Sequence, residues 1–123
     1  MIKYLPPAVS NGLIVVGCLA PTSAAEAQSF FVPGHASAQH ELHSIVRIGP
    51  AKLKVLFSRG GFTTTAFIEA EIDCKTDMSR MTRVGVAKNE LATAAGHDGW
   101  NKNLSVGWGR GVTDFACAKM GIR

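Results

Sequence analysis

The chain has 123 residues, of which 13 are Lys or Arg and 9 are Asp or Glu, and its formal net charge is +4. This length leaves room for one small domain and excludes a multidomain enzyme. Charged residues make up 18% and hydrophobic residues 46% of the chain. No apolar run approaches the roughly 20 residues of a membrane span. The composition therefore predicts one globular unit that does not cross a membrane.

The first 27 residues differ in composition from the rest of the chain. Lys3 precedes the apolar segment 13–20, and small residues follow up to Ala25 and Ala27. This order is typical of an export signal peptide. The spacing of Ala25 and Ala27 suits a signal peptidase that accepts only small side chains, which predicts cleavage before Gln28.

A second processing site lies within the same segment. The residues Val15-Val16-Gly17-Cys18 resemble the lipobox of bacterial lipoproteins, in which the cysteine is acylated and becomes the mature N-terminus. Acylation of Cys18 would give the protein a lipid anchor. Release after Ala27 is favoured because the apolar stretch before Cys18 is short. Both alternatives predict an exported protein that is periplasmic, secreted or attached to the outer surface.

The remaining cysteines form an even pair. Removal or acylation of Cys18 leaves Cys74 and Cys117 in an oxidising compartment, which predicts a disulfide between them. Closing a loop of about 44 residues would stabilise the fold by about 4 kcal/mol in the chain-entropy model. Free buried thiols and metal ligation are the alternatives.

The basic residues are scattered along the chain with acidic residues between them. Nucleic-acid binding is not expected, because no continuous basic run could follow a phosphate backbone. A mildly cationic surface is compatible with anionic glycans, lipid headgroups or acidic patches on proteins.

Two patterns of alternation predict the first part of the sheet. Residues 28–42 are expected to be a flexible lead-in. Residues 43–48 and 52–57 then form an antiparallel hairpin around the turn at Gly49-Pro50-Ala51. In the longest regular segment, which ends at Cys74, one face is apolar and the other carries acids that are expected to point to water. The apolar face consists of Thr64, Ala66, Ile68, Ala70, Ile72 and Cys74.

The rest of the chain is predicted to pair with this sheet and to pack on it. A strand is expected over 80–86, one or two helical turns over 88–95, and an irregular loop over 96–111 with a strand near 104–108. Helical spacing of apolar residues predicts a short helix over 112–120. The fold class is therefore α+β, a small antiparallel β-sheet of about four to five strands with a short C-terminal helix and one disulfide. The predicted organisation is a signal peptide at 1–27, the lead-in at 28–42 and a single domain at 43–123.

Several motifs in this order resemble those of a known family. The segment "IEAEIDCKTDMSRMTRV" is followed by a Trp-containing loop and by "GRGVTDFACA". These motifs, with "IDC", Arg83, Trp100 and "DFAC" in order, resemble the bacterial surface-adhesin protein E family over residues 45–118. The resemblance implies a small exported protein with a sheet, a packed C-terminal helix, a disulfide between the matched cysteines, and binding of host matrix proteins.

Three histidines lie close together near the start of the predicted mature chain. His35, His40 and His43 are weak candidates for a metal site, since imidazole binds zinc, copper and nickel. On a strand, however, His40 and His43 would point to opposite faces. Histidines in a hydrated loop are therefore the favoured interpretation, and no metal or cofactor is expected.

A binding surface is a further hypothesis for the glycine-rich loop. Trp100, Trp108 and Arg110 could contact a protein or a sugar there, although coverage of the small core by the indoles is the favoured interpretation. No nucleophile motif or phosphate-binding glycine loop is present, so an enzyme is not expected. The leading hypothesis is an adhesin-like interaction domain for macromolecules of the host or the cell envelope. The alternatives are an envelope inhibitor or accessory protein of the lysozyme-inhibitor kind, and a periplasmic metal-handling protein.

Overall fold

The computed structural model describes residues 27–61 and 63–123. Residues 1–26 of the predicted signal peptide, with Ala25 and Cys18, lie outside the described residues. The elements are β2 (Gln28–Phe30), β3 (Gln39–Arg47), β4 (Lys52–Gly60), β5 (Thr65–Asp73), β6 (Met78–Gly85), β7 (Ala92–Thr93), β8 (Asn101–Lys102) and α1 (Trp108–Lys119).

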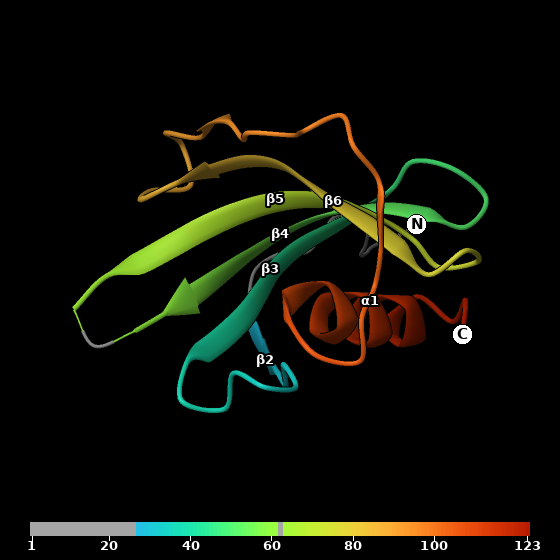
Figure 1. The fold of residues 1–123 in the computed structure, drawn as a ribbon, viewed down its shortest axis with the longest axis horizontal. Coiled ribbons are helices and arrows are strands. Elements are labelled where there is room, and N and C mark those ends of the chain that lie inside the picture. Colours follow the sequence, from blue (N-terminus) through green and yellow to red (C-terminus); the bar gives the residue numbers. More distant parts are fainter. Residues whose placement is uncertain (1–26, 62) are drawn as a thin grey trace, which may run out of the picture.

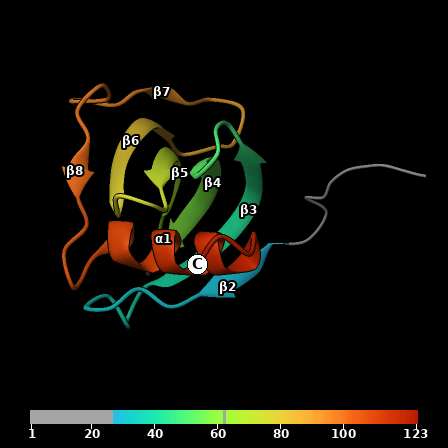
Figure 2. The same cartoon turned by 90° about the vertical axis from the view of Figure 1, so that its right-hand side faces the viewer.

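All strands in the described residues belong to one antiparallel sheet with the order β2-β3-β4-β5-β6-β7, and β8 also pairs with β6. The helix α1 lies against one face of this sheet (Figure 1). A view at right angles shows the strands curving around the helix (Figure 2). The predicted α+β class is confirmed. The sheet has seven strands instead of four or five because the short strands β2, β7 and β8 pair along its edges.

The core lies between the sheet and α1. The period of two along β4 and β5 places one side chain in two on the helix side, and the helix contributes Val112, Ala116 and Cys117. The apolar face predicted for the longest segment is therefore the buried face from Ile68 onward. The buried strand residues are Leu53, Val55, Phe57, Ile68, Ala70 and Ile72.

The predicted disulfide between Cys74 and Cys117 is confirmed. The two Cα atoms are 5.9 Å apart, and both side chains belong to the core cluster. Cys74 directly follows β5 and Cys117 lies in α1, so the bond links the end of the central strand to the helix.

The expected lead-in is part of the sheet, so the prediction of little structure there was wrong. It contains β2 and the first residues of β3. These residues extend the sheet and cover one side of α1, where water would otherwise reach the core. Four side chains from this segment are buried: Phe30, Val32, His40 and Leu42.

Three expectations for the C-terminal third were also wrong. Residues 88–95 form turns and β7 instead of helical turns, and no strand forms over 104–108. The backbone amide of Ala94 donates a hydrogen bond to the carbonyl of Thr82, at the edge of β6. Pairing with β6 is favoured because a helix of one or two turns is unstable without such backbone hydrogen-bond partners. The helix begins at Trp108, four residues before the predicted start. No helix within residues 27–61 and 63–123 is long and apolar enough to cross a membrane.

Candidate functional site

The sheet has a second face, which points away from α1. Side chains alternate along β4, so Leu53, Val55 and Phe57 point to the core and Lys54 and Leu56 point to this second face. The residues paired with Lys54 and Leu56 on the neighbouring strands point to the same face. We call this surface the outer face. Its residues are Ser44, Val46, Lys54, Leu56, Glu69, Glu71, Arg80 and Arg83.

Two ion pairs between β5 and β6 order the outer face. Arg83 Nη2 lies 2.8 Å from Glu69 Oε2, and Arg80 Nη2 lies 2.7 Å from Glu71 Oε1. Both glutamates are mostly covered, with 15% and 16% of their side-chain surfaces exposed. Hydrogen bonds from Arg83 lower the pKa of Glu69, so this carboxylate stays ionised and accepts hydrogen bonds. The acids expected to point freely to water are therefore paired.

Trp100 lies at the edge of the outer face. The guanidinium carbon of Arg80 is 4.6 Å from the centroid of the Trp100 ring, and Lys52 Nζ is 5.5 Å from it. These separations are within the range of cation–π attraction. Arg80 also forms the salt bridge to Glu71, so two contacts hold its guanidinium in place beside the indole of Trp100.

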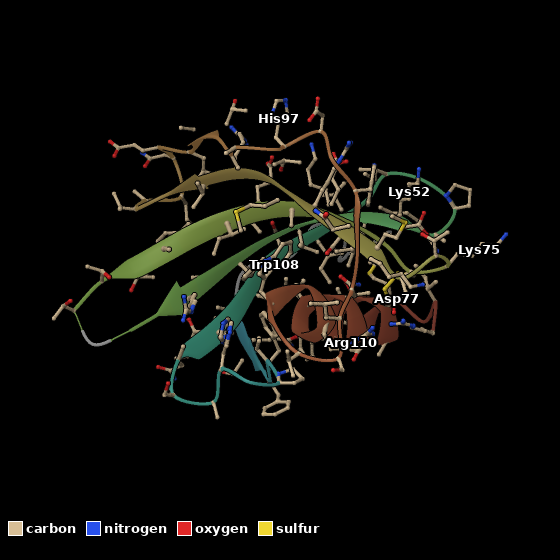
Figure 3. All side chains as sticks on the ribbon, in the orientation of Figure 1. Lys52, Lys75, Asp77, His97, Trp108 and Arg110 are labelled. Carbon is tan, nitrogen blue, oxygen red and sulfur yellow. A yellow bond between two sulfur atoms is a disulfide. The ribbon has the colours of Figure 1, made fainter. Side chains whose placement is uncertain are left out.

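Trp108 and Arg110 lie on the other side of the sheet, so the structure does not bring the three predicted binding residues together. The Trp108 ring stacks on Phe57 in the core, with centroids 5.9 Å apart. Arg110, also in α1, forms a salt bridge to Asp77 at 2.5 Å, and Figure 3 shows these two side chains beside the helix. Only Trp100 borders the outer face.

Asp77 is the centre of a polar cluster between the β5–β6 turn and α1. Its φ of 60° is in the left-handed region, which Asp tolerates better than most residues. Its carboxylate accepts hydrogen bonds from Arg110, Arg123 and Asn103. The bonds from Arg110 hold the pKa of Asp77 well below its usual range. The cluster joins the turn, the helix and the C-terminus, which is a structural role.

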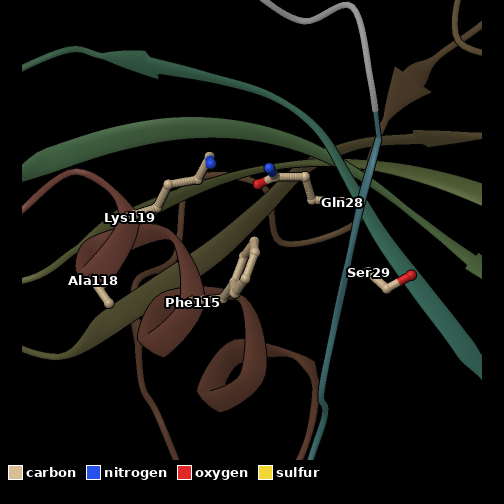
Figure 4. A pocket seen from close by; sticks show the side chains of 5 residues that line it. All are labelled: Gln28, Ser29, Phe115, Ala118 and Lys119. Atoms are coloured by element: carbon tan, nitrogen blue, oxygen red, sulfur yellow. The ribbon is translucent and has the colours of Figure 1, made fainter.

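Two hollows flank α1. One, of about 640 Å³, lies between β2 and the helix, where Gln28 and Lys119 approach each other above Phe115 (Figure 4). The other, of about 270 Å³, lies beside the start of the helix and is lined by residues that include Ser79, Asn103 and Arg110. Ser79 and Asn103 are hydrogen-bonded to each other, and Arg110 is paired with Asp77. Neither hollow contains the nucleophile and adjacent base that hydrolytic catalysis needs.

The expectation that the three candidate histidines lie in a hydrated loop was wrong for His40 and His43, because both lie in β3 and His40 is buried. The three separate into a pair and a single residue. His35 and His40 stack with ring centroids 6.3 Å apart. His43 is on the outer side, where its Nε2 lies 2.8 Å from Ser58 Oγ and its ring contacts Phe67. The expectation that His40 and His43 point to opposite faces is confirmed. In the part of the chain that the structure describes, no group of three or more His, Cys, Asp or Glu could hold a metal ion.

Comparison with protein-family models, curated proteins and solved structures gives no match. The resemblance to the surface-adhesin protein E family therefore stays a prediction.

Sequence analysis did not identify Arg80 and Lys52 as neighbours of Trp100. A signal for the ion pairs was present: acids alternate along one face of β5, and the following strand carries Arg80 and Arg83. Antiparallel pairing around the Lys75–Ser79 turn places opposite charges across from each other. Nothing in the sequence predicted that a residue beyond β7 would return to stack on Arg80.

Proposed function

We propose that this protein is an exported interaction domain that binds a protein or glycan of the cell envelope or of a host surface. The observation that carries the proposal is the outer face: a sheet surface opposite the helix on which Arg80 is held by Glu71 and by Trp100. The proposal assigns no catalytic activity and no cofactor. The resemblance of the Cys74 and Cys117 motifs to the surface-adhesin protein E family supports the same class of function.

The composition of the outer face supports binding by contact with a macromolecule. Val46 is 55% exposed, and the side chain of Arg83 is 48% exposed. Aromatic, aliphatic and guanidinium groups side by side are the combination that contributes most to protein interfaces. Lys52 and Lys54 add positive charges that are not part of the two ion pairs, and they can contact acidic groups of a partner.

The proposal is tested by measuring binding of the purified chain to immobilised host matrix proteins, to envelope proteins and to heparin. We expect saturable binding that weakens at least about tenfold in Trp100→Ala and in Arg83→Ala, because these substitutions remove a partly exposed indole and an exposed guanidinium. Lys75→Ala is the matched control, since Lys75 is exposed in the turn after β5 and outside the outer face (Figure 3).

Two results would contradict the proposal. One is binding that is equal in the parent, in both outer-face variants and in the control, because the outer face would then contribute nothing. The other is the absence of binding combined with inhibition of lysozyme, which would favour the alternative of an envelope inhibitor.

A further inference from the structure

His35 and His40 each have one ring nitrogen without a hydrogen-bond partner. These atoms are Nδ1 of His35 and Nε2 of His40, and both are buried. His40 as a whole is only 2% exposed. A buried polar atom without a partner costs free energy, so two of them on adjacent rings require an explanation.

The backbone around the pair is held in place by its own hydrogen bonds. The amide of His35 donates to the Val32 carbonyl, and the amide of Ala38 donates to the His35 carbonyl, at 3.0 and 3.1 Å. His40 lies in β3, paired with β2 on one side and with β4 on the other. His35 therefore lies in a hydrogen-bonded turn, and His40 lies in a strand that is paired on both sides.

The tautomer of His40 leaves a lone pair on the unpartnered nitrogen. With the ring proton on Nδ1, the lone pair of His40 is on Nε2, the nitrogen that has no partner. A histidine that binds a metal commonly donates its second nitrogen to a backbone carbonyl.

We propose that His35 Nδ1 and His40 Nε2 bind one monovalent copper ion, Cu(I), between them. If each ring nitrogen forms a bond of about 2 Å to the metal, the two ring centroids are about 5 Å apart when the nitrogen–metal–nitrogen angle is tetrahedral. They are about 6.4 Å apart when this angle is linear. The observed separation is 6.3 Å, with ring planes only 19° apart. This separation leaves room for one ion bonded to a nitrogen of each ring, and coordination by two ligands is a preference of Cu(I).

The charges around the pair favour a monovalent ion over Zn²⁺. Arg59 is the register partner of His40 on β4, and its positive charge acts on the ring. Repulsion from Arg59 rises with the charge of the ion. In the described residues no further His, Cys, Asp or Glu completes the pair, so the site lacks the three or four protein ligands that Zn²⁺ takes, whereas copper accepts imidazole readily. This site is independent of the outer face, so the two proposals fail separately.

The experiment is an anaerobic competition for Cu(I) between the protein and the chromophoric chelator bicinchoninate. The full chain is used with Cys18→Ser in every sample, because a free thiol binds Cu(I), and with the disulfide intact. We expect one Cu(I) per chain and an affinity at least about tenfold lower in His35→Gln and in His40→Gln. His97→Gln is the control, since His97 is exposed between β7 and β8 (Figure 3).

Nitrogen-15 spectra of the imidazole rings give a second measurement. Addition of Cu(I) is expected to shift His35 Nδ1 and His40 Nε2 and to leave His43 unchanged. If His40→Gln does not fold, His35→Gln decides the test, because His35 is only partly buried. The proposal is overturned if the parent binds no Cu(I), if His35→Gln binds it as tightly as the parent, or if His97→Gln loses it.

Discussion

Trp100 and Trp108 are close in sequence and lie on opposite sides of the sheet. Trp108 begins α1 and stacks on Phe57, which is fully buried. Trp100 stacks on Arg80 at the edge of the outer face. A residue that covers the core and a residue that borders a binding surface respond differently to the same substitution.

The two tryptophans therefore provide a paired prediction. Trp108→Ala is expected to lower the free energy of unfolding by about 2 kcal/mol, because it removes a large, partly buried side chain that packs against the core. Trp100→Ala is expected to change it by less than about 1 kcal/mol, because only a partly exposed cation–π contact is lost. Urea unfolding at pH 7 measures both. Equal losses in the two variants would contradict the assignment of Trp108 to the core and of Trp100 to the surface.

Asp77 provides a prediction about acid pH. Its pKa is lower in the folded protein than its ordinary 3.8, so it stabilises the fold above pH 3.8 and loses this contribution as the pH falls through the folded-state pKa. Asp77→Asn keeps a residue that tolerates the left-handed backbone and removes the charge. We expect a loss of about 1 kcal/mol at pH 7, because solvent screens these partly exposed ion pairs.

The measurement is urea unfolding of the parent and of Asp77→Asn at pH 7 and at pH values below 3.8. The difference between them should shrink as the acid protonates Asp77 in the parent. A difference that is equal at both ends of this range would show that the charge of Asp77 is not the cause.

The helix α1 begins in a segment that contains several glycines. Tertiary contacts explain why Gly109 and Gly111 carry no side chain. A Cβ atom on Gly109 would lie 2.5 Å from Asn103 Oδ1. On Gly111 it would lie 2.7 Å from Val32 Cγ2 and 2.8 Å from the Phe31 carbonyl oxygen. The helix therefore approaches β2 and its following turn at a distance that only glycine permits.

Gly111→Ala tests this close approach through the sign of its effect. In an ordinary helix this change stabilises by about 1 kcal/mol. Here we expect a net loss of about 1 to 3 kcal/mol, because the added methyl group collides with backbone and core atoms. Ala118→Gly, at an exposed position of the same helix, is the control and should lose about 1 kcal/mol from helix propensity alone. A more stable Gly111→Ala protein would contradict the contact.

At the scale of the whole molecule, one covalent bond joins the two layers. Cys74 and Cys117 are 43 positions apart and connect the end of β5 to α1. The helix has no other covalent link to the sheet except the chain that leads into it. The bond therefore closes residues 74–117 into a loop in the unfolded chain, which limits the conformations of nearly half of the described residues.

Replacement of both cysteines by serine is expected to lower the free energy of unfolding by about 2 to 4 kcal/mol. Urea unfolding with and without reductant measures the effect, with Cys18→Ser in both proteins. Reductant should destabilise the parent and leave the double variant unchanged. Equal stability of the parent in both conditions would mean that the bond contributes little to the fold.

The local pattern of the sequence was sufficient for the central strands, for the buried face of β5 and for the partnership of Cys74 with Cys117. Side-chain alternation and cysteine parity depend only on neighbours along the chain and on the compartment. Export and the surface-adhesin resemblance are also sequence predictions, and they remain predictions.

Tertiary structure alone decided which distant residues meet. Helix propensity argues against a helix start among Gly107, Gly109 and Gly111. Tertiary contacts make glycine suitable at two of these positions, because Asn103 and Ser79 lie against Gly109, and Phe31 and Val32 lie against Gly111. The meeting of Trp100 with Arg80, and of His35 with His40, depends on how turns return the chain to the sheet. Such contacts are set by the packing of the whole domain, because no pattern within a single segment encodes the position of another.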